Sequence, residues 1–249
     1  MSDVHPGSEP RARDRAEAWL LVVLAVVALA GCLLRGPVLL GDVVGPAPTA
    51  WWITPVVLLG LLLLAVESVR AGRLADARMR AVRLPVAIAL LAEIVLAVLP
   101  WLAAPAVVVG VVALAVAAAR LLPLEPARSV RQRIALHGPV LLALGWTAAL
   151  TPAAGESLGA TLGLGGGEAS VLLAWAAVIV VGIAGTWVID RTRAPLPFAI
   201  GLLWGLAWTL PGGPEWMVTP VLVAILAVGW VLVRRLTRTG PPTWSGAFA

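Results

Sequence analysis

Long apolar runs separated by short, arginine-bearing segments restrict most strongly how this chain of 249 residues can fold. The clearest stretch extends from Gly45 to Arg83: it opens with prolines and the pair Trp51-Trp52, continues almost without charge to Val66, and ends among five arginines. An apolar run with aromatic residues at one end and positive charge at the other is typical of a transmembrane helix. With 61% hydrophobic and 12% charged residues, the chain is predicted to be an integral membrane protein.

Eight such runs predict an all-α, polytopic bundle of about eight transmembrane helices. They cover, approximately, residues 18–34, 50–69, 84–102, 104–121, 134–152, 170–189, 195–211 and 217–233. The transmembrane domain is therefore expected at 18–233, between a disordered cytoplasmic N-terminus at 1–17 and a cytoplasmic tail at 234–249. Residues 29–32 resemble a lipoprotein cleavage box, and cleavage at Cys32 would leave seven helices.

The distribution of arginine orients the predicted helices. Of eighteen basic residues, all arginine, seventeen fall in the two termini and in alternate loops, and Arg35 alone lies on the opposite side. Because positively charged loops remain in the cytoplasm, both termini are expected to be cytoplasmic. This role accounts for the arginines without a nucleic-acid partner. The lack of lysine, asparagine and tyrosine indicates a GC-rich bacterial genome, and hence a bacterial cytoplasmic membrane.

The segment 153–169 is rich in glycine and is expected to be a flexible loop on the outer side. Its sequence Gly-Leu-Gly-Gly-Gly resembles a phosphate-binding loop only superficially, because neither a lysine nor a preceding strand accompanies it. A linker is the favoured interpretation.

Three ionisable residues lie within the predicted spans, and each is a candidate functional group because a charge is costly in lipid. Glu93 lies about nine residues into its predicted helix, roughly 13 Å from the cytoplasmic end. It either makes a neutral structural hydrogen bond or binds a ligand or a proton. Glu67 and His137 lie near the cytoplasmic boundary, where they either pair across helices or extend to the headgroups.

Catalytic and metal-binding patterns are lacking in the sequence. The chain has one cysteine and two histidines, of which only His137 lies within the predicted domain, so that an ordinary metal site cannot be assembled. No nucleophile, base and orienting acid are spaced as a catalytic set. An enzyme is therefore not expected, and neither is a cofactor.

Tryptophan is unusually frequent, with twelve residues against two phenylalanines. Most of them lie near predicted helix ends, as tryptophans at membrane interfaces do. Trp146, Trp175 and Trp204 lie deeper, and Trp204 shares a helical face with Trp208. These deep side chains either pack within the bundle or line an apolar pocket for a flat ligand.

Three stretches resemble the longer bacterial members of the TspO/MBR family, the tryptophan-rich sensory proteins. Pro46-Ala47 with Trp51, Ile53 and the continuation LLGLLLLAVESV is similar to one helix of that family, Leu144-Gly145-Trp146 resembles its Leu-Gly-Trp helix, and Trp204 falls where a late helix often has tryptophan. Pro48, Thr54 and Ala154 depart from the family's usual residues. The resemblance implies a membrane receptor or sensor for flat hydrophobic ligands, such as tetrapyrroles or sterol-like molecules.

Three hypotheses of function follow. The first is such a receptor, with the lipid bilayer and the ligand as its partners, and its ligand site is predicted at Trp51, Trp146, Trp175, Trp204 and Trp208. The second is a proton-coupled transporter of small molecules that uses Glu93. The third is a non-catalytic scaffold subunit, or a homo-oligomer, that packs through Gly201-x-x-x-Gly205, since this spacing lets a neighbouring helix approach closely.

Overall fold

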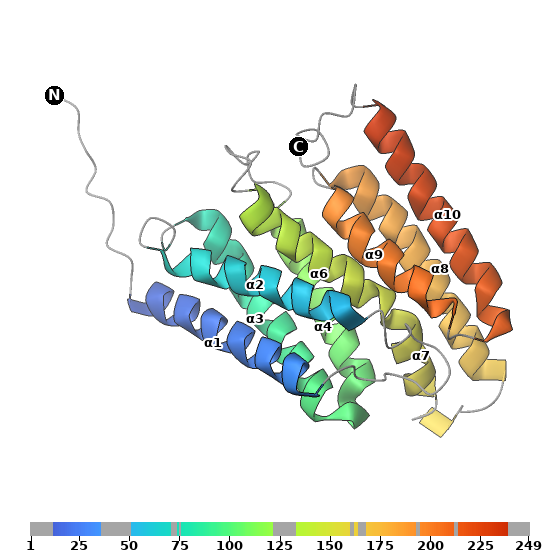
Figure 1. The fold of residues 1–249 in the computed structure, drawn as a ribbon, viewed down its shortest axis with the longest axis horizontal. Helices are drawn as coiled ribbons and strands as arrows, with labels where there is room; N and C mark the ends of the chain where they lie inside the picture. Colours follow the sequence, from blue (N-terminus) through green and yellow to red (C-terminus); the bar gives the residue numbers. More distant parts are fainter. Residues whose placement is uncertain are drawn as a thin grey trace.

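The computed structural model describes residues 12–35, 51–70, 74, 76–121, 133–159, 162–163, 168–192, 195–211 and 214–238 (Figure 1). Within these ranges the chain is helical and contains no strand, which confirms the predicted all-α fold. The α-helices are α1 (Ala12–Arg35), α2 (Ile53–Val69), α3 (Ala77–Val98), α4 (Ala103–Leu121), α6 (Gly138–Ala149), α7 (Thr151–Gly159), α8 (Glu168–Arg191), α9 (Pro195–Thr209) and α10 (Glu215–Arg238). A short 3-10 turn, η2 (Pro100–Leu102), precedes α4, and a π-helical turn, η3 (Arg133–His137), precedes α6.

The helices run back and forth across the bundle in eight passes. Helices α6 and α7 are separated only by Leu150 and form one pass, and each of the other seven long helices forms one more. Six of the passes are long and apolar enough to cross a membrane, while α2, with 17 residues, and α9, with 15, are shorter. This arrangement is the one that an integral membrane protein requires.

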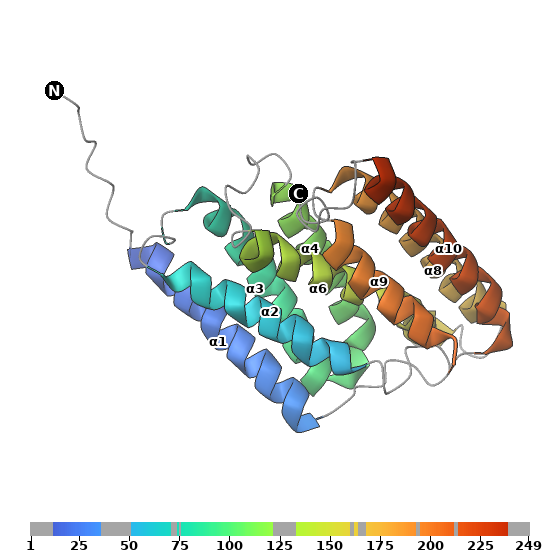
Figure 2. The ribbon, with the colours of Figure 1, turned by 45° about the horizontal axis from the view of Figure 1, so that its top comes forward.

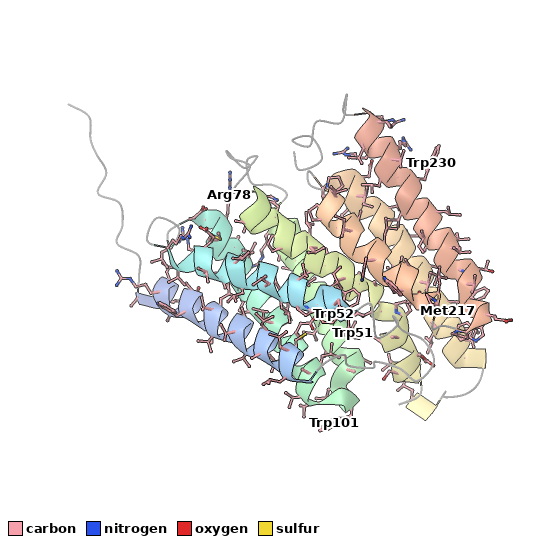
Figure 3. The ribbon with its side chains drawn as sticks, in the orientation of Figure 1. Trp51, Trp52, Arg78, Trp101, Met217 and Trp230 are labelled. Atoms are coloured by element: carbon pink, nitrogen blue, oxygen red, sulfur yellow. The ribbon has the colours of Figure 1, made fainter. Side chains whose placement is uncertain are left out.

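Helix α1 lies at one edge of the bundle, beside α2 and α3, and α8 and α10 lie at the other edge (Figure 2). The centre is the crossing of α6 with α9. Arg78 and Trp230 lie at one end of the bundle, and Trp101 and Met217 lie at the opposite end (Figure 3). We call these the arginine end and the far end; that the arginine end faces the cytoplasm remains a prediction.

Two helices begin earlier than the apolar runs indicate. Helix α1 starts at Ala12, so that residues 12–17, expected to be disordered, are helical, and Arg13 pairs there with Glu17 at 2.8 Å, one turn further on. Helix α3 starts at Ala77 and not at position 84, because the Asp76 carboxylate caps it by accepting a hydrogen bond of 2.9 Å from the Arg78 backbone N–H. The predicted loop at 70–83 is therefore partly helical.

The glycine-rich segment 153–169 is not wholly a loop. Residues 153–159 belong to α7, which packs against α8 and α4, and Ala153 and Ala154 are buried. Small side chains allow this close approach of helices, so the composition that indicates flexibility also suits tight packing. Most of the remaining residues of the segment lie outside the described part of the chain.

Glycines bring α6 and α9 into backbone contact, which confirms the close approach predicted at Gly201-x-x-x-Gly205. A Cβ atom at Gly201 would lie 2.5 Å from the Leu142 carbonyl oxygen and 2.7 Å from the Trp146 backbone nitrogen, and one at Gly205 would collide with the Ala149 side chain. The helix that approaches is α6 of the same chain. These glycines are therefore occupied by a helix of the same chain, and a scaffold role stays a prediction that they do not support.

A proline inside α3 is compensated by an arginine of α4. Pro85 has no N–H group, so the carbonyl of Ala81, four residues earlier, lacks its usual helical donor. Arg120 donates to this carbonyl oxygen at 3.1 Å. The bond joins α4 to α3 at the arginine end.

Candidate functional site

A small cavity lies between α1, α2 and α3 near the far end of the bundle. Its volume is about 20 Å³, enough for one water molecule and far below the roughly 300 Å³ of the smaller ligand pockets. On each helix the lining residues are three and four positions apart, which places them on one face. The lining residues are Ala28, Gly31 and Cys32 from α1, Trp51 just before α2, Thr54 and Leu58 from α2, and Glu93, Leu96 and Ala97 from α3.

Two buried polar groups of the cavity wall have no hydrogen-bond partner. They are the Trp51 indole N–H and the Thr54 hydroxyl, on side chains of residues that are 7% and 5% exposed. Two other buried threonines, Thr147 and Thr209, bond to a carbonyl of the preceding helical turn, at 2.9 Å and 2.6 Å, whereas the hydroxyls of Thr151 and Thr192 also lack a partner. Thr54 lies in the first turn of α2, so its hydroxyl has no full preceding helical turn whose carbonyl oxygens could accept a hydrogen bond. A buried polar group without a partner typically costs about 1–3 kcal/mol, so these two groups require an explanation.

The third polar group of the cavity is the Glu93 carboxyl. Within the described part of the chain, no group hydrogen-bonds to it and no cation pairs with it. Glu93 lies sixteen residues after the start of α3 and five before its end at Val98. Its depth therefore differs from the prediction: it is about 24 Å from the arginine end of the helix and about 7 Å from the far end.

Trp51 connects the cavity to the centre of the bundle. Its ring meets Trp146 of α6 edge to face, with 5.6 Å between centroids and 87° between planes. Trp51 stands at the start of α2 (Figure 3), and Trp146 is fully buried against α9. The Trp146 indole N–H also has no hydrogen-bond partner. Two of the five predicted ligand-binding tryptophans thus lie together, and one of them, Trp51, lines the cavity with Glu93.

The other three predicted tryptophans lie elsewhere. Trp204 and Trp208 share a face of α9, as predicted, with 5.9 Å between ring centroids, and Trp204 is 40% exposed on the outside of the bundle. Trp175 lies on α8 and is also exposed. None of the three lines the cavity.

Glu67 and His137 lie at the arginine end, away from the cavity. Glu67, in the last turn of α2, forms an ion pair with Arg70. His137 ends η3, and η3 packs against α2. The two predicted ionisable residues therefore belong to neighbouring elements, and Glu93 alone of the three contributes to the cavity.

Arg83 is a buried residue whose role is not evident from the sequence, where Arg83 belongs to the predicted arginine-bearing loop at 70–83. It is 2% exposed and donates to the carbonyl oxygens of Leu74 at 3.0 Å, Ser68 at 3.4 Å and Asp14 at 3.4 Å. The Asp14 carboxylate lies 3.6 Å from its Nη1. The signal that could have revealed it is its position on the face of α3 that also carries Met79.

The described residues offer little for metal binding, since no three histidine, cysteine or acidic side chains come together among them. Cys32 is a free thiol in the cavity wall. No protein-family model, curated protein or solved structure matches this chain. The function has to be inferred from the cavity and its polar groups.

Proposed function

We propose that this integral membrane protein binds a small hydrogen-bonding molecule in the cavity between α1, α2 and α3, with Glu93 as the anchor. One observation carries the proposal: Glu93, Trp51 and Thr54 converge on one cavity, and none of their polar groups has a partner in the described chain. Ionisable groups within membrane spans are expensive and commonly mark paths for substrates, ions or protons.

The chemistry of two of the three groups, Glu93 and Thr54, favours a small cation that carries N–H donors, while the Trp51 N–H, which only donates, does not bond to such a cation. A carboxylate accepts such donors and balances the positive charge, and the Thr54 hydroxyl can accept a further bond. Because one carboxyl holds either a proton or the cation, binding of one displaces the other. This competition supports proton-coupled exchange as the activity.

Guanidinium is a suitable probe, because it is permanently charged and rich in N–H donors. It has four non-hydrogen atoms, so the cavity of about 20 Å³ must widen to admit it. We expect proteoliposomes with an acidic interior to accumulate labelled guanidinium faster than empty liposomes do, and Glu93→Gln to abolish the difference. Glu67→Gln is the matched control, since Glu67 lies outside the cavity. Uptake by Glu93→Gln equal to that of the unmodified protein would overturn the proposal.

The Trp51–Trp146 pair supports a second candidate, the receptor for flat hydrophobic ligands that the resemblance to the TspO/MBR family implies. Two indoles that meet edge to face, each with an unpartnered N–H group, offer both a ring contact and donors to a tetrapyrrole. A cavity of about 20 Å³ must widen far more to admit a tetrapyrrole than to admit a small cation, so this candidate ranks second.

Titration with a porphyrin tests the second candidate. It predicts saturable quenching of tryptophan fluorescence, with weaker binding for Trp146→Phe and unchanged binding for Trp175→Phe. Quenching that never saturates, or that is the same in both variants, would remove it.

A further inference from the structure

The cavity is not sealed, and its opening lies between α1 and α3. Of its nine lining residues, four are partly exposed and five are buried. The partly exposed residues are Gly31 and Cys32 on α1 and Glu93 and Ala97 on α3, whereas the lining residues in and just before α2 are all buried. The polar groups of the site are therefore reached from the side on which α1 faces α3.

Small side chains form the rim of this opening. A Cβ atom at Gly31 would lie 4.0 Å from that of Ala97, in ordinary van der Waals contact, so the space between these two positions exists because residue 31 is glycine. Cys32 lies three residues before the end of α1 at Arg35, about 5 Å along the helix axis. The rim is therefore close to the far end, and behind it are the two buried, unpartnered polar groups of Trp51 and Thr54.

Toward the arginine end, the same three helices bury an apolar seam. On α1 the seam extends from the cavity wall at Ala28 to Ala18, about 15 Å. Its residues are at most 1% exposed and comprise Ala18, Leu21 and Ala25 of α1, Leu61, Leu64 and Ala65 of α2, and Val82, Val86 and Leu90 of α3. A charged ligand that came from the arginine end would have to cross this seam, whereas one that came from the far end would meet Glu93 after about 7 Å.

We propose that the cavity takes its ligand from the side of the membrane at the far end, through an entrance between α1 and α3 whose rim is Gly31, Cys32 and Ala97. The proposal rests on the proposed function in taking the cavity as the binding site. The structure then holds the site in the state that faces the far end, and the size of the rim residues limits which cations reach Glu93.

Cys32 reports which side of the membrane reaches the entrance, because its thiol is free and the chain has no other cysteine. The full chain, in intact cells and in inverted membrane vesicles, would be treated with the impermeant cation 2-(trimethylammonium)ethyl methanethiosulfonate, and its disulfide with Cys32 detected by mass spectrometry. In a Cys32→Ser background, Trp101→Cys marks the far end and Arg13→Cys, at the start of α1, marks the arginine end (Figure 3). We expect Cys32 to react only from the side of Trp101→Cys. Reaction from the side of Arg13→Cys, or from neither side, would overturn the entrance.

Substitutions at the rim test its size. In Gly31→Val the two γ carbons would fill the space beside Ala97, so we expect both the modification of Cys32 and the uptake of guanidinium to slow several-fold, with Gly31→Ala intermediate. Ala30→Val is the matched control, because Ala30 is the preceding residue of α1 and is exposed on the outside of the bundle. Equal rates of Cys32 modification in Gly31→Ala, Gly31→Val and Ala30→Val would overturn the role of the rim.

The entrance and the proposed function can fail separately. Modification of Cys32 places a bulky group on the rim, so it should block guanidinium uptake, and dithiothreitol should restore it. Uptake that continues unchanged in the fully modified protein would overturn the entrance. One-sided modification of Cys32 in a protein that never takes up guanidinium would support the entrance and contradict the proposed function.

Discussion

At the scale of single residues, the buried polar groups of Thr54 and Trp51 are expected to serve function at a cost in stability. Thr54 and Trp51 hold polar atoms without partners, although each is almost fully buried. Evolution of stability alone would favour apolar groups of the same shape, because an unsatisfied group is costly. Their presence beside Glu93 is what a binding site predicts.

Thr54→Val tests this separation. It removes an unpartnered hydroxyl with little change of shape, so we expect the free energy of unfolding to rise by about 1 kcal/mol while guanidinium uptake falls several-fold. Thr147→Val is the control, and it should lower stability, because the Thr147 hydroxyl bonds to Ala143 at 2.9 Å. Thermal unfolding in detergent and uptake assays measure the two effects. A loss of stability in Thr54→Val would contradict the interpretation.

Arg83 serves stability through its charge. Arg83→Met keeps most of the side-chain volume but leaves Asp14 and the carbonyls of Ser68 and Leu74 without their donor. Because removal of one partner from a buried pair is strongly destabilising, we expect a loss of about 3 kcal/mol in the free energy of unfolding. Arg80→Met, at an exposed position of the same helix, should have almost no effect. A denaturant titration measures both variants. Equal unfolding midpoints for Arg83→Met and the unmodified protein would show that the buried contacts of Arg83 contribute nothing to stability.

Sequence reasoning identified two members of the site but not the site. Glu93 is recognisable as an ionisable residue within an apolar run, and Trp51 as part of a tryptophan-rich pattern. Their meeting depends on the rotation of α2 and α3 about their axes and on how α1 packs between them, and composition does not determine either. Thr54 gave no signal because threonines in apolar helices usually bond to their own backbone.

At the scale of elements, the crossing of α6 and α9 is the most constrained contact. Gly201→Ala would place its Cβ 2.5 Å from a backbone oxygen and 2.7 Å from a backbone nitrogen, neither of which can turn away as a side chain can. We expect a loss of about 1–3 kcal/mol, and also a weaker Trp51–Trp146 contact, since Trp146 supplies that nitrogen.

Gly229→Ala is the control for this substitution, because a Cβ there meets nothing within 4 Å. Alanine is preferred to glycine inside a helix, so stability should rise by about 0.5–1 kcal/mol. Unfolding temperatures that shift in the same direction for both variants would contradict the close crossing.

The number and order of the helices were predictable, and their starts were not. The thickness of the hydrocarbon core sets the length of apolar run that a spanning helix needs, so eight runs of about that length predict eight passes. The first turns of α1 and α3 contain arginines and acids that a hydropathy pattern excludes, and local capping by Asp76 decides the start of α3. In the segment 153–169, packing of small residues prevails over the flexibility that glycine indicates.

At the scale of the whole molecule, eight passes place the start of α1 and the end of α10 at the same end of the bundle (Figure 1). In a Cys32→Ser background, cysteines that replace the exposed Arg13 and Arg238 should therefore react with a membrane-impermeant maleimide from the same side, and a cysteine that replaces the exposed Trp101 should react from the opposite side. The positive-inside rule further predicts that positions 13 and 238 react only from the cytoplasmic side. Reaction of positions 13 and 238 from different sides would contradict the eight-pass path.

Proton release on binding tests the central claim, that one carboxyl in the α1–α2–α3 cavity exchanges a proton for a cation. Guanidinium would be added to the purified protein in weakly buffered detergent solution over a series of pH values. The account predicts release of up to about one proton for each guanidinium bound by the unmodified protein and by Glu67→Gln, and no binding or release with Glu93→Gln. Binding without proton release, or the same release from Glu93→Gln, would contradict it.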